Sequence, residues 1–176
     1  MDKNKKLIVI GGPTASGKTA LAVKLALEHG AEVFSADSRQ IYRELNIGVA
    51  RPTEEEMQGV PHHFINCVSI HEDYSVGRYE AELLAALETY YQNHVTAILV
   101  GGTGLYLKAI THGIDSFPDI PEEINAQLQT EWESSGLEPL TEELLQKDPD
   151  TYATLDLQNP RRVLRALAVI RATGQP

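Results

Sequence analysis

The sequence has only one cysteine, Cys67, among its 176 residues. A single thiol cannot form an intramolecular disulfide or a multi-cysteine zinc site, so both kinds of structural cross-link are excluded. This composition favours the cytosol as the compartment. Because no basic motif surrounds Cys67, we expect a buried, inert thiol rather than a catalytic one.

Long apolar runs and an excess of positive charge are also missing. No apolar stretch reaches membrane-spanning length, and the first twelve residues, MDKNKKLIVIGG, are interrupted by glycine too early for a signal peptide. The formal net charge of -10 argues against a general nucleic-acid-coating protein, although it leaves room for a local basic site. We therefore expect no membrane association. We also expect a monomer.

The hydrophobic pattern alternates between strands and helices in the first two thirds of the chain. Short apolar runs capped by glycine or polar residues predict buried strands, and apolar residues at helical spacing predict helices. We expect three strands: one at 7–10, one in AEVFSADS that ends at 35 or 36, and one at 96–104. We expect a helix at 19–28, ended by Gly30, and a second helix at 74–93. Leu83, Leu84 and Leu87 should lie on the inner face of the second helix. This alternation predicts an α/β fold, a parallel sheet with helices on both faces.

The character of the sequence changes near residues 114–120. Phe117, Pro118 and Pro121 interrupt the pattern, and the remainder of the chain is predicted to form helices, the first starting at Pro121. We expect an α/β core at 1–116 and a helical region at 117–176. The last residues, RATGQP, end a helix without a closing strand, which predicts a shortened chain.

The strongest motif is GPTASGKT, which fits G-x-x-x-x-G-K-T, a loop that wraps phosphates and is common in ATP- and GTP-binding proteins. Its glycines let backbone amides face an anion, and the following helix adds the positive end of its dipole. Lys18 can reach terminal phosphate oxygens, and the Thr19 hydroxyl can ligate Mg²⁺. The predicted phosphate-binding residues are Gly12, Pro13, Thr14, Ala15, Ser16, Gly17, Lys18 and Thr19.

Polar residues follow the second predicted strand in the stretch SADSRQIY. A carboxylate at Asp37 would face the acceptor substrate at the carboxyl edge of the sheet, where it can take a proton from an attacking group. The alternative is a helix N-cap. Ser38, Arg39 and Gln40 are either hydrogen-bonding partners of a polar acceptor or solvated loop residues.

The third predicted strand ends in GGTG. Nucleotide hydrolases commonly place an aspartate there to hold Mg²⁺, so its absence counts against an ATPase or GTPase. Thr103 is either a turn residue or a hydroxyl at the same edge as Asp37.

Two further groups stand out. Val163, Leu167 and Ile170 form an apolar stripe in NPRRVLRALAVI, beside a basic face of arginines, Arg161, Arg162 and Arg165, that suits phosphate contacts or is simply solvated. For His62 and His63 we favour a structural role at a strand edge over a metal site.

Taken together and in this order, GPTASGKT, SADSRQIYRELNIGVARPT, PHH, ILVGGTGLYLKAI and LQNPRRVLRALAVI resemble the tRNA dimethylallyltransferases of the bacterial type. The resemblance covers nearly the whole chain. It implies a P-loop NTPase-like fold and transfer of a dimethylallyl group from dimethylallyl diphosphate to N6 of an adenosine beside the anticodon, with Mg²⁺ as cofactor.

The resemblance also implies residue roles. It places the donor diphosphate on the phosphate loop and makes Asp37 the general base, with Lys18 and Thr103 as further catalytic residues. The tRNA anticodon stem-loop would be bound by Asp37, Ser38, Arg39, Gln40, Thr103, Gln158, Asn159, Pro160, Arg161 and Arg162.

Two departures from the family pattern affect these expectations. Asn125 stands where relatives often carry arginine, which puts a tRNA backbone contact in doubt. Family members also run on beyond the point that matches Pro176, so we expect weak or absent transfer and reduced tRNA affinity from these 176 residues alone.

Three other functions fit parts of the pattern. A small-molecule kinase also uses a phosphate loop and an aspartate after the second strand. An adenylate prenyltransferase would perform the same chemistry on a free nucleotide. A non-catalytic phosphate-loop module would have no need of Lys18, Thr19 and Asp37 together.

Overall fold

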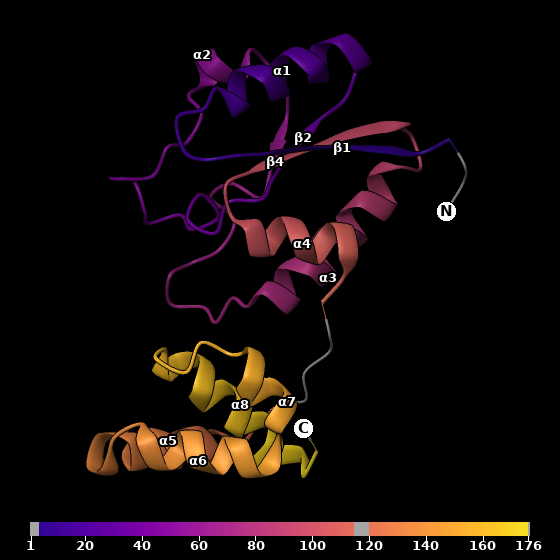
Figure 1. Cartoon of the computed structure of the whole chain (residues 1–176). Coiled ribbons are helices and arrows are strands. Elements are labelled where there is room, and N and C mark those ends of the chain that lie inside the picture. The colour runs from indigo at the N-terminus through magenta and orange to yellow at the C-terminus, as the bar shows by residue number, and fades with distance from the viewer. Residues whose placement is uncertain (1–3, 115–119, 176) are drawn as a thin grey trace. The chain divides into compact units, whose positions relative to one another are not determined.

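The computed structural model describes residues 4–114 and 120–175 (Figure 1). The chain forms two compact units, Met1–Ile114 and Asp115–Pro176. The boundary predicted between residues 116 and 117 lies outside the described residues. In the described ranges, no helix has the length and apolar character needed to cross a membrane.

The first unit is built on a four-stranded sheet whose strands are all parallel. Its strands are β1 (Lys6–Gly11), β2 (Val33–Ser35), β3 (His62–His63) and β4 (Thr96–Gly101). They are arranged in the order β1-β4-β2-β3, so the last strand in the sequence pairs with both β1 and β2. The predicted parallel sheet is confirmed. The third predicted strand ends at Gly101, and the GT after it forms the turn into the next helix.

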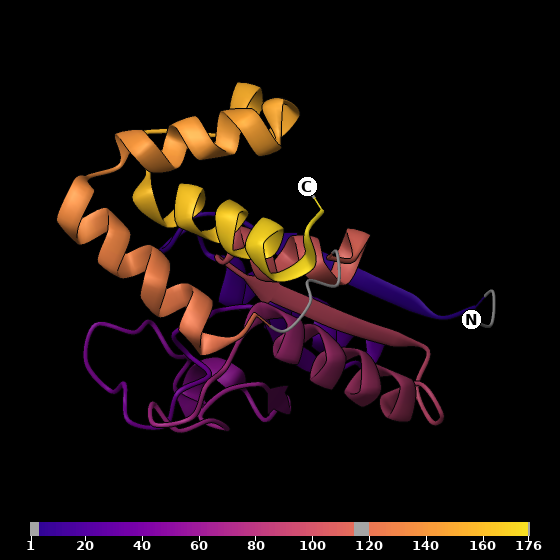
Figure 2. The ribbon, with the colours of Figure 1, turned by 90° about the horizontal axis from the view of Figure 1, so that it is seen from below.

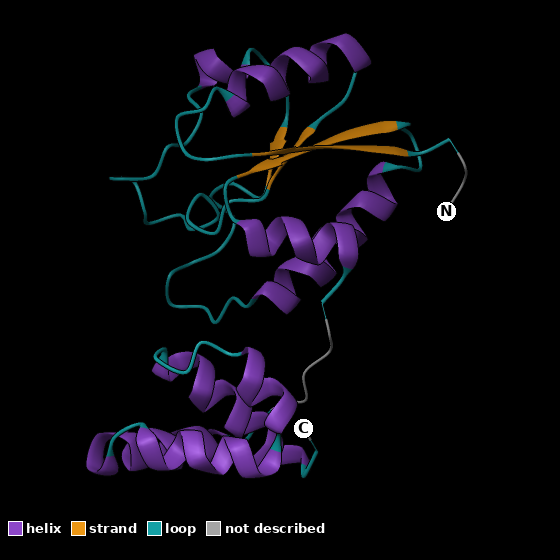
Figure 3. Ribbon diagram, in the orientation of Figure 1, coloured by secondary structure: helices purple, strands orange, loops and turns teal. Residues whose placement is uncertain are grey.

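Helices cover both faces of this sheet (Figure 3). One face carries α1 (Lys18–His29) and the short α2 (Glu54–Met57), and the other carries α3 (Val76–Tyr90) and α4 (Gly104–His112). Helix α1 ends as predicted at Gly30, whose φ of 58° is left-handed and favours glycine. It packs through Ala22, Val23 and Ala26, and its Leu21 side is exposed.

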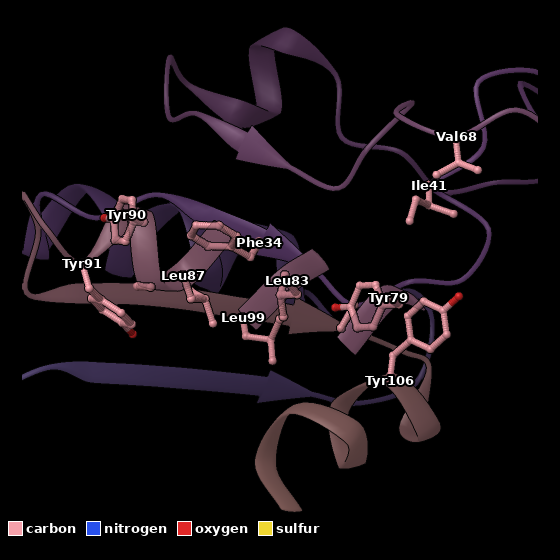
Figure 4. Close-up of a cluster of buried hydrophobic side chains, with 12 residues drawn as sticks. Phe34, Ile41, Val68, Tyr79, Leu83, Leu87, Tyr90, Tyr91, Leu99 and Tyr106 are labelled. Carbon is pink, nitrogen blue, oxygen red and sulfur yellow. The ribbon is translucent and has the colours of Figure 1, made fainter. Parts of the chain in front are cut away.

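The larger core cluster of the first unit lies between the sheet and α3 and α4 (Figure 4). Helix α3 buries Tyr79, Leu83, Leu87 and Tyr90, which recur at intervals of three or four residues. The prediction for Leu83 and Leu87 is confirmed. It is wrong for Leu84, which lies one position off this stripe and is 42% exposed.

The second unit is helical, as predicted for its described residues. It contains α5 (Glu122–Ser135), α6 (Glu138–Lys147), α7 (Pro149–Thr154) and α8 (Pro160–Thr173). Helix α8 packs against both α5 and α6 (Figure 2). The predicted stripe of Val163, Leu167 and Ile170 is buried in this core.

An ion-pair cluster joins three helices of the second unit. The Arg171 guanidinium on α8 contacts the Glu131 carboxylate on α5 at 2.7 Å and the Glu143 carboxylate on α6 at 2.5 Å. Hydrogen bonds from Arg171 lower the pKa of both carboxyl groups below the ordinary glutamate value. The cluster therefore ties α8 to its two neighbours.

Candidate active site

The phosphate loop connects β1 to α1. Ala15 and Gly17 adopt left-handed backbone angles, with φ of 62° and 80°, and Gly17 is the N-cap of α1. The Lys18 ammonium group donates a hydrogen bond to the Pro13 carbonyl oxygen inside the same loop. A strand, a loop with left-handed turns and a helix N-terminus follow in the order that an anion-binding loop requires.

Asp37 follows β2 and organises the turn after it. Its Oδ1 accepts hydrogen bonds from the backbone amides of Arg39, at 2.9 Å, and Gln40, at 3.3 Å. In the described ranges no helix begins here, so these contacts hold a turn, and the helix N-cap considered as the alternative for Asp37 is wrong. None of the described residues donates a hydrogen bond to Oδ2, so holding the turn and a role in proton transfer are compatible in one side chain.

The ends of β2 and β4 meet closely beside Asp37. The Thr103 hydroxyl accepts a hydrogen bond from the Ser38 amide at 2.9 Å, and the Thr103 amide donates to the Ala36 carbonyl oxygen at 3.2 Å. A Cβ at Gly101 would lie 2.1 Å from that same carbonyl oxygen, so only glycine fits there. Gly101 thus lets β4 bring Thr103 against the Asp37 turn.

Gln40 links this turn to a more distant part of the chain. Its Oε1 accepts from the Ser35 hydroxyl at 3.0 Å, and its Nε2 donates to the Ala50 carbonyl oxygen at 2.6 Å. Both ends of the amide are used inside the protein. This geometry gives Gln40 a structural role at the site, in addition to the binding role predicted for it.

A pocket of about 300 Å³ opens between these elements. It brings together part of the predicted site, while Gly12, Pro13, Ser38, Arg39 and Thr103 are not among its lining residues. The lining consists of Thr14, Ala15, Ser16, Gly17, Lys18, Thr19, Ala20, Ser35, Asp37, Gln40, Ala50, Arg51, Pro52, Glu56, His62, Ile65, Val100, Gly101 and Gly102.

The segment 50–65 contributes a side of the pocket that no predicted site residue covers. Its lining members are Ala50, Arg51, Pro52, Glu56, His62 and Ile65. Arg51, Pro52 and His62 fall inside two of the sequence blocks that carry the family resemblance, which was the available signal. A structural role at an edge strand is confirmed for His63, which lies in β3, pairs with Phe34 of β2 and has its Nε2 2.5 Å from the Glu32 carboxylate.

Two buried tyrosines, Tyr79 and Tyr106, lie near the end of β2, which leads into the Asp37 turn. Tyr79 donates a hydrogen bond to the Ser35 carbonyl oxygen at 3.0 Å and stacks on Tyr106, with the ring centroids 4.0 Å apart. Burial raises the pKa of Tyr106, with smaller contributions from Tyr42 and Asp37. Tyr106 therefore stays protonated near the Asp37 carboxylate at neutral pH.

Cys67 differs from its prediction in position. The residue is exposed rather than buried, because it lies in a surface loop between β3 and α3. Partial desolvation of the thiol raises its pKa, which keeps it protonated and unreactive at neutral pH, as expected.

The predicted tRNA-binding block on α8 begins with a cap. Asn159 is the N-cap and its side chain accepts from the Arg162 amide at 3.4 Å, and Pro160 takes the first helical position. Gln158, Arg161 and Arg162 are exposed. The block belongs to the second unit, whereas the pocket belongs to the first.

Comparison with known proteins identifies the family. The family model described as IPP transferase matches residues 40–176. The chain belongs to the IPP transferase family. It is 50% identical to the tRNA dimethylallyltransferase of Cytophaga hutchinsonii over 173 residues. This alignment covers 98% of this chain and 57% of that relative. It is 44% identical over 170 residues to the tRNA dimethylallyltransferase of Christiangramia forsetii, covering 97% of this chain and 56% of the relative.

Solved structures agree with this assignment to the IPP transferase family. The full-length tRNA isopentenylpyrophosphate transferase from Bacillus halodurans superposes with a TM-score of 0.62 at 39% identity, covering 99% of this chain and 57% of that one. A eukaryotic dimethylallyltransferase solved acting on tRNA gives a TM-score of 0.82 at 31% identity, covering 97% of this chain and 42% of that one. The fold is P-loop NTPase-like, and the chain spans a little over half the length of the curated relatives that it matches.

Proposed function

We propose that this IPP transferase family member transfers the dimethylallyl group of dimethylallyl diphosphate to N6 of an adenosine adjacent to the anticodon of tRNA. One observation carries the proposal: the phosphate loop and Asp37 line the same pocket, while glycines occupy the end of β4. A nucleotide hydrolase commonly has an acidic magnesium ligand at that place. The site thus combines a phosphate cradle with a base.

The donor diphosphate is assigned to the loop Gly12–Thr19. Amides of the loop, the N-terminus of the twelve-residue helix α1 and the Lys18 ammonium group stabilise negative charge there. Charge grows on the diphosphate as the allylic carbon–oxygen bond breaks, so these groups bind the transition state more tightly than the ground state. Apolar lining residues, Ala50, Pro52, Ile65 and Val100, suit the dimethylallyl chain.

The acceptor nitrogen is assigned to the Asp37 side of the pocket. N6 forms the new bond to the allylic carbon, the diphosphate leaves with the electron pair of the carbon–oxygen bond, and Asp37 Oδ2 accepts the N6 proton. The adenosine has to leave the base stack to reach this pocket. Thr103 holds the Asp37 turn through Ser38, so its contribution is to position the base.

Magnesium fits this site as an ion shared with the donor. No group of three or more histidine, cysteine, aspartate or glutamate residues in the described ranges can hold a metal by itself. Oxygen donors of Thr19, Ser35 and Asp37 nevertheless line the pocket, and Mg²⁺ typically binds through one or two protein oxygens, substrate phosphates and water. When bound, it neutralises charge on the leaving diphosphate.

Contacts to tRNA are assigned to two places, in which Arg39, Gln158, Arg161 and Arg162 are exposed and the other residues are partly buried. Ser38, Arg39 and Gln40 lie on the Asp37 turn, and Gln158, Asn159, Pro160, Arg161 and Arg162 lie at the start of α8. Exposed guanidinium groups beside a helix N-terminus suit the phosphates of an RNA backbone. The anticodon stem-loop is the part of tRNA expected at these residues.

The test is incubation of the chain with radiolabelled dimethylallyl diphosphate, Mg²⁺ and unmodified tRNA. Because weak transfer at most is expected from these 176 residues alone, we expect a low yield of label in N6 of the adenosine beside the anticodon, with release of pyrophosphate. Transfer of a phosphoryl group from ATP to a small molecule instead would support a kinase. Modification of free AMP or ADP in preference to tRNA would support an adenylate prenyltransferase.

A further inference from the structure

Two buried side-chain nitrogens lack a hydrogen-bond partner in the described part of the chain, Arg51 Nε and His62 Nε2. Both residues line the pocket that contains the phosphate loop. Leaving a buried polar atom unpaired is unfavourable, so most buried polar atoms in folded proteins are paired. The occurrence of both exceptions in one pocket points to a ligand that pairs with them.

His62 has a defined orientation and tautomer. Its Nδ1 lies 2.8 Å from the Val60 carbonyl oxygen, which can only accept, so Nδ1 carries the proton. In the neutral ring Nε2 then has a lone pair, and in the protonated ring it is an N–H donor. The neighbouring His63 is engaged elsewhere, since it contacts Glu32 and stacks on Phe34.

Arg51 is a fixed cation. Its Nη1 donates to Asn46 Oδ1 at 2.8 Å and its Nη2 donates to the Tyr42 carbonyl oxygen. Both contacts are with neutral groups, and no described carboxylate forms an ion pair with Arg51. The guanidinium is therefore held by the loop with no described carboxylate at ion-pair distance and with its Nε–H unused.

We propose that Arg51 and His62 bind the diphosphate of the donor from outside the phosphate loop, and that His62 takes up a proton when the diphosphate binds. This inference rests on the proposed function. Phosphate oxygens only accept hydrogen bonds, so both nitrogens have to be donors. Arg51 meets this condition at any physiological pH, and His62 meets it as an imidazolium, which a nearby anion favours.

The pocket also holds charged groups other than His62. Lys18 and Arg51 carry positive charge, and Asp37 and Glu56 carry negative charge. The Glu56 carboxylate is occupied, since its Oε2 accepts from the Thr53 amide at 2.8 Å. Carboxyl, ammonium and guanidinium groups as chemical classes titrate outside the range of about pH 6 to 8, whereas imidazole titrates within it.

The experiment is titration of the 176-residue chain with inorganic pyrophosphate and Mg²⁺ by calorimetry at about pH 6 and pH 8, on either side of the imidazole range. The variants are His62→Leu, His62→Gln and, as a matched control, His71→Leu, because His71 is exposed and outside the pocket. Each variant is compared with wild type at the same pH, so the change in protonation of pyrophosphate with pH cancels from the difference in affinity. Thermal melts of all variants establish that they are folded.

We expect His62→Leu to weaken pyrophosphate binding about tenfold or more at the lower pH, the effect of one hydrogen bond to a charged group, with a smaller loss at the higher pH. His62→Gln keeps an N–H donor near the Nε2 position, so we expect it to retain most of the affinity at the higher pH and to lose the extra affinity at the lower one. His71→Leu should bind as wild type at both values.

Equal affinity of His62→Leu and wild type at the lower pH would overturn the inference. A loss of the same size at both pH values would overturn the proton uptake. Absence of pyrophosphate binding by wild type would overturn both this inference and the donor half of the proposed function. His62-dependent pyrophosphate binding together with phosphoryl transfer from ATP to a small molecule would count against the proposed function alone.

Discussion

At the scale of single residues, Asp37 uses its two carboxylate oxygens differently. Oδ1 holds the turn through the amides of Arg39 and Gln40, and Oδ2 receives no hydrogen bond from a described residue. Asparagine at this position can keep the Oδ1 contacts but cannot accept a proton. The substitution Asp37→Asn therefore removes the proton acceptor and keeps the hydrogen bonds that hold the turn.

We expect Asp37→Asn to lower the rate of prenyl transfer by ~10²–10⁴-fold, the usual contribution of a general base, with little change in donor affinity. Single-turnover transfer and a separate donor titration measure the two effects. Asp73→Asn, at an exposed aspartate outside the pocket, is the control. A change confined to KM would contradict the role of Asp37 as base.

Gly101 is the second residue on which the site depends. An alanine Cβ would collide with the Ala36 carbonyl oxygen, which is backbone and cannot rotate away. We expect Gly101→Ala to destabilise the first unit by about 3 kcal/mol, the upper end for overpacking, as measured by chemical denaturation. Gly104→Ala is the control, because a Cβ there meets no atom within 4 Å; equal stability of the two variants would contradict the crowding argument.

At the scale of elements, the Arg171 cluster holds α8 against α5 and α6. The folded state lowers the pKa of Glu131 and Glu143, so these carboxylates bind protons less readily in the folded chain than in the unfolded one. Their contribution to stability is present above the unfolded glutamate pKa of about 4.3 and is lost as the pH falls through the lowered values. The second unit should therefore weaken in acid.

We expect Arg171→Met to reduce the stability of the second unit by about 1–2 kcal/mol at neutral pH, between the values for exposed and buried ion pairs. The difference from wild type should shrink as the pH falls below the lowered glutamate values. The single tryptophan, Trp132, packs against the core of this unit, so its fluorescence reports urea unfolding there. Arg162→Met on the same helix is the control, and an equal shift in both variants would argue against the cluster.

At the scale of the whole molecule, the net charge of -10 opposes a broad electrostatic attraction to tRNA. Affinity then depends on a few local cations. If Arg161 and Arg162 contact phosphates, the double variant Arg161→Ala/Arg162→Ala should reduce the slope of log K against log salt by about 1.5, at about 0.7–0.9 per contact. Filter binding at salt concentrations between about 50 and 200 mM measures the slope. An unchanged slope would remove these arginines from the interface, and Lys24→Ala on α1 is the control.

How much the sequence predicts depends on how local the cause of each feature is. The strand, loop and helix from Lys6 to His29 carry their own signals in apolar runs and glycines, and the sequence predicts all three. Strand β3 has two residues and exists because Val33 and Phe34 pair with it, which no local pattern shows. The exposure of Leu84 and Cys67 likewise depends on the elements that the fold places beside them.

The candidate site also contains parts that the sequence predicts and parts that it does not. The phosphate loop and Asp37 belong to motifs whose residues act close to where they stand in the sequence. The segment 50–65 has no periodicity, and it reaches the pocket because Gln40 and Arg51 hydrogen-bond across the loop. His62 stands out because its buried Nε2 has no hydrogen-bond partner among the described residues, and a sequence pattern cannot show this.

The strand order β1-β4-β2-β3 has a consequence for the time course of synthesis. Lys6 pairs with Thr96, so the phosphate loop is anchored by a strand that leaves the ribosome ninety residues after its own. At a synthesis rate of about 5–20 residues per second, this delay is roughly 5–18 seconds. During that interval β1 and β2 have apolar side chains and no common neighbour. The emergence of Thr96–Gly101 is therefore the event that closes the sheet and completes the pocket in the nascent chain.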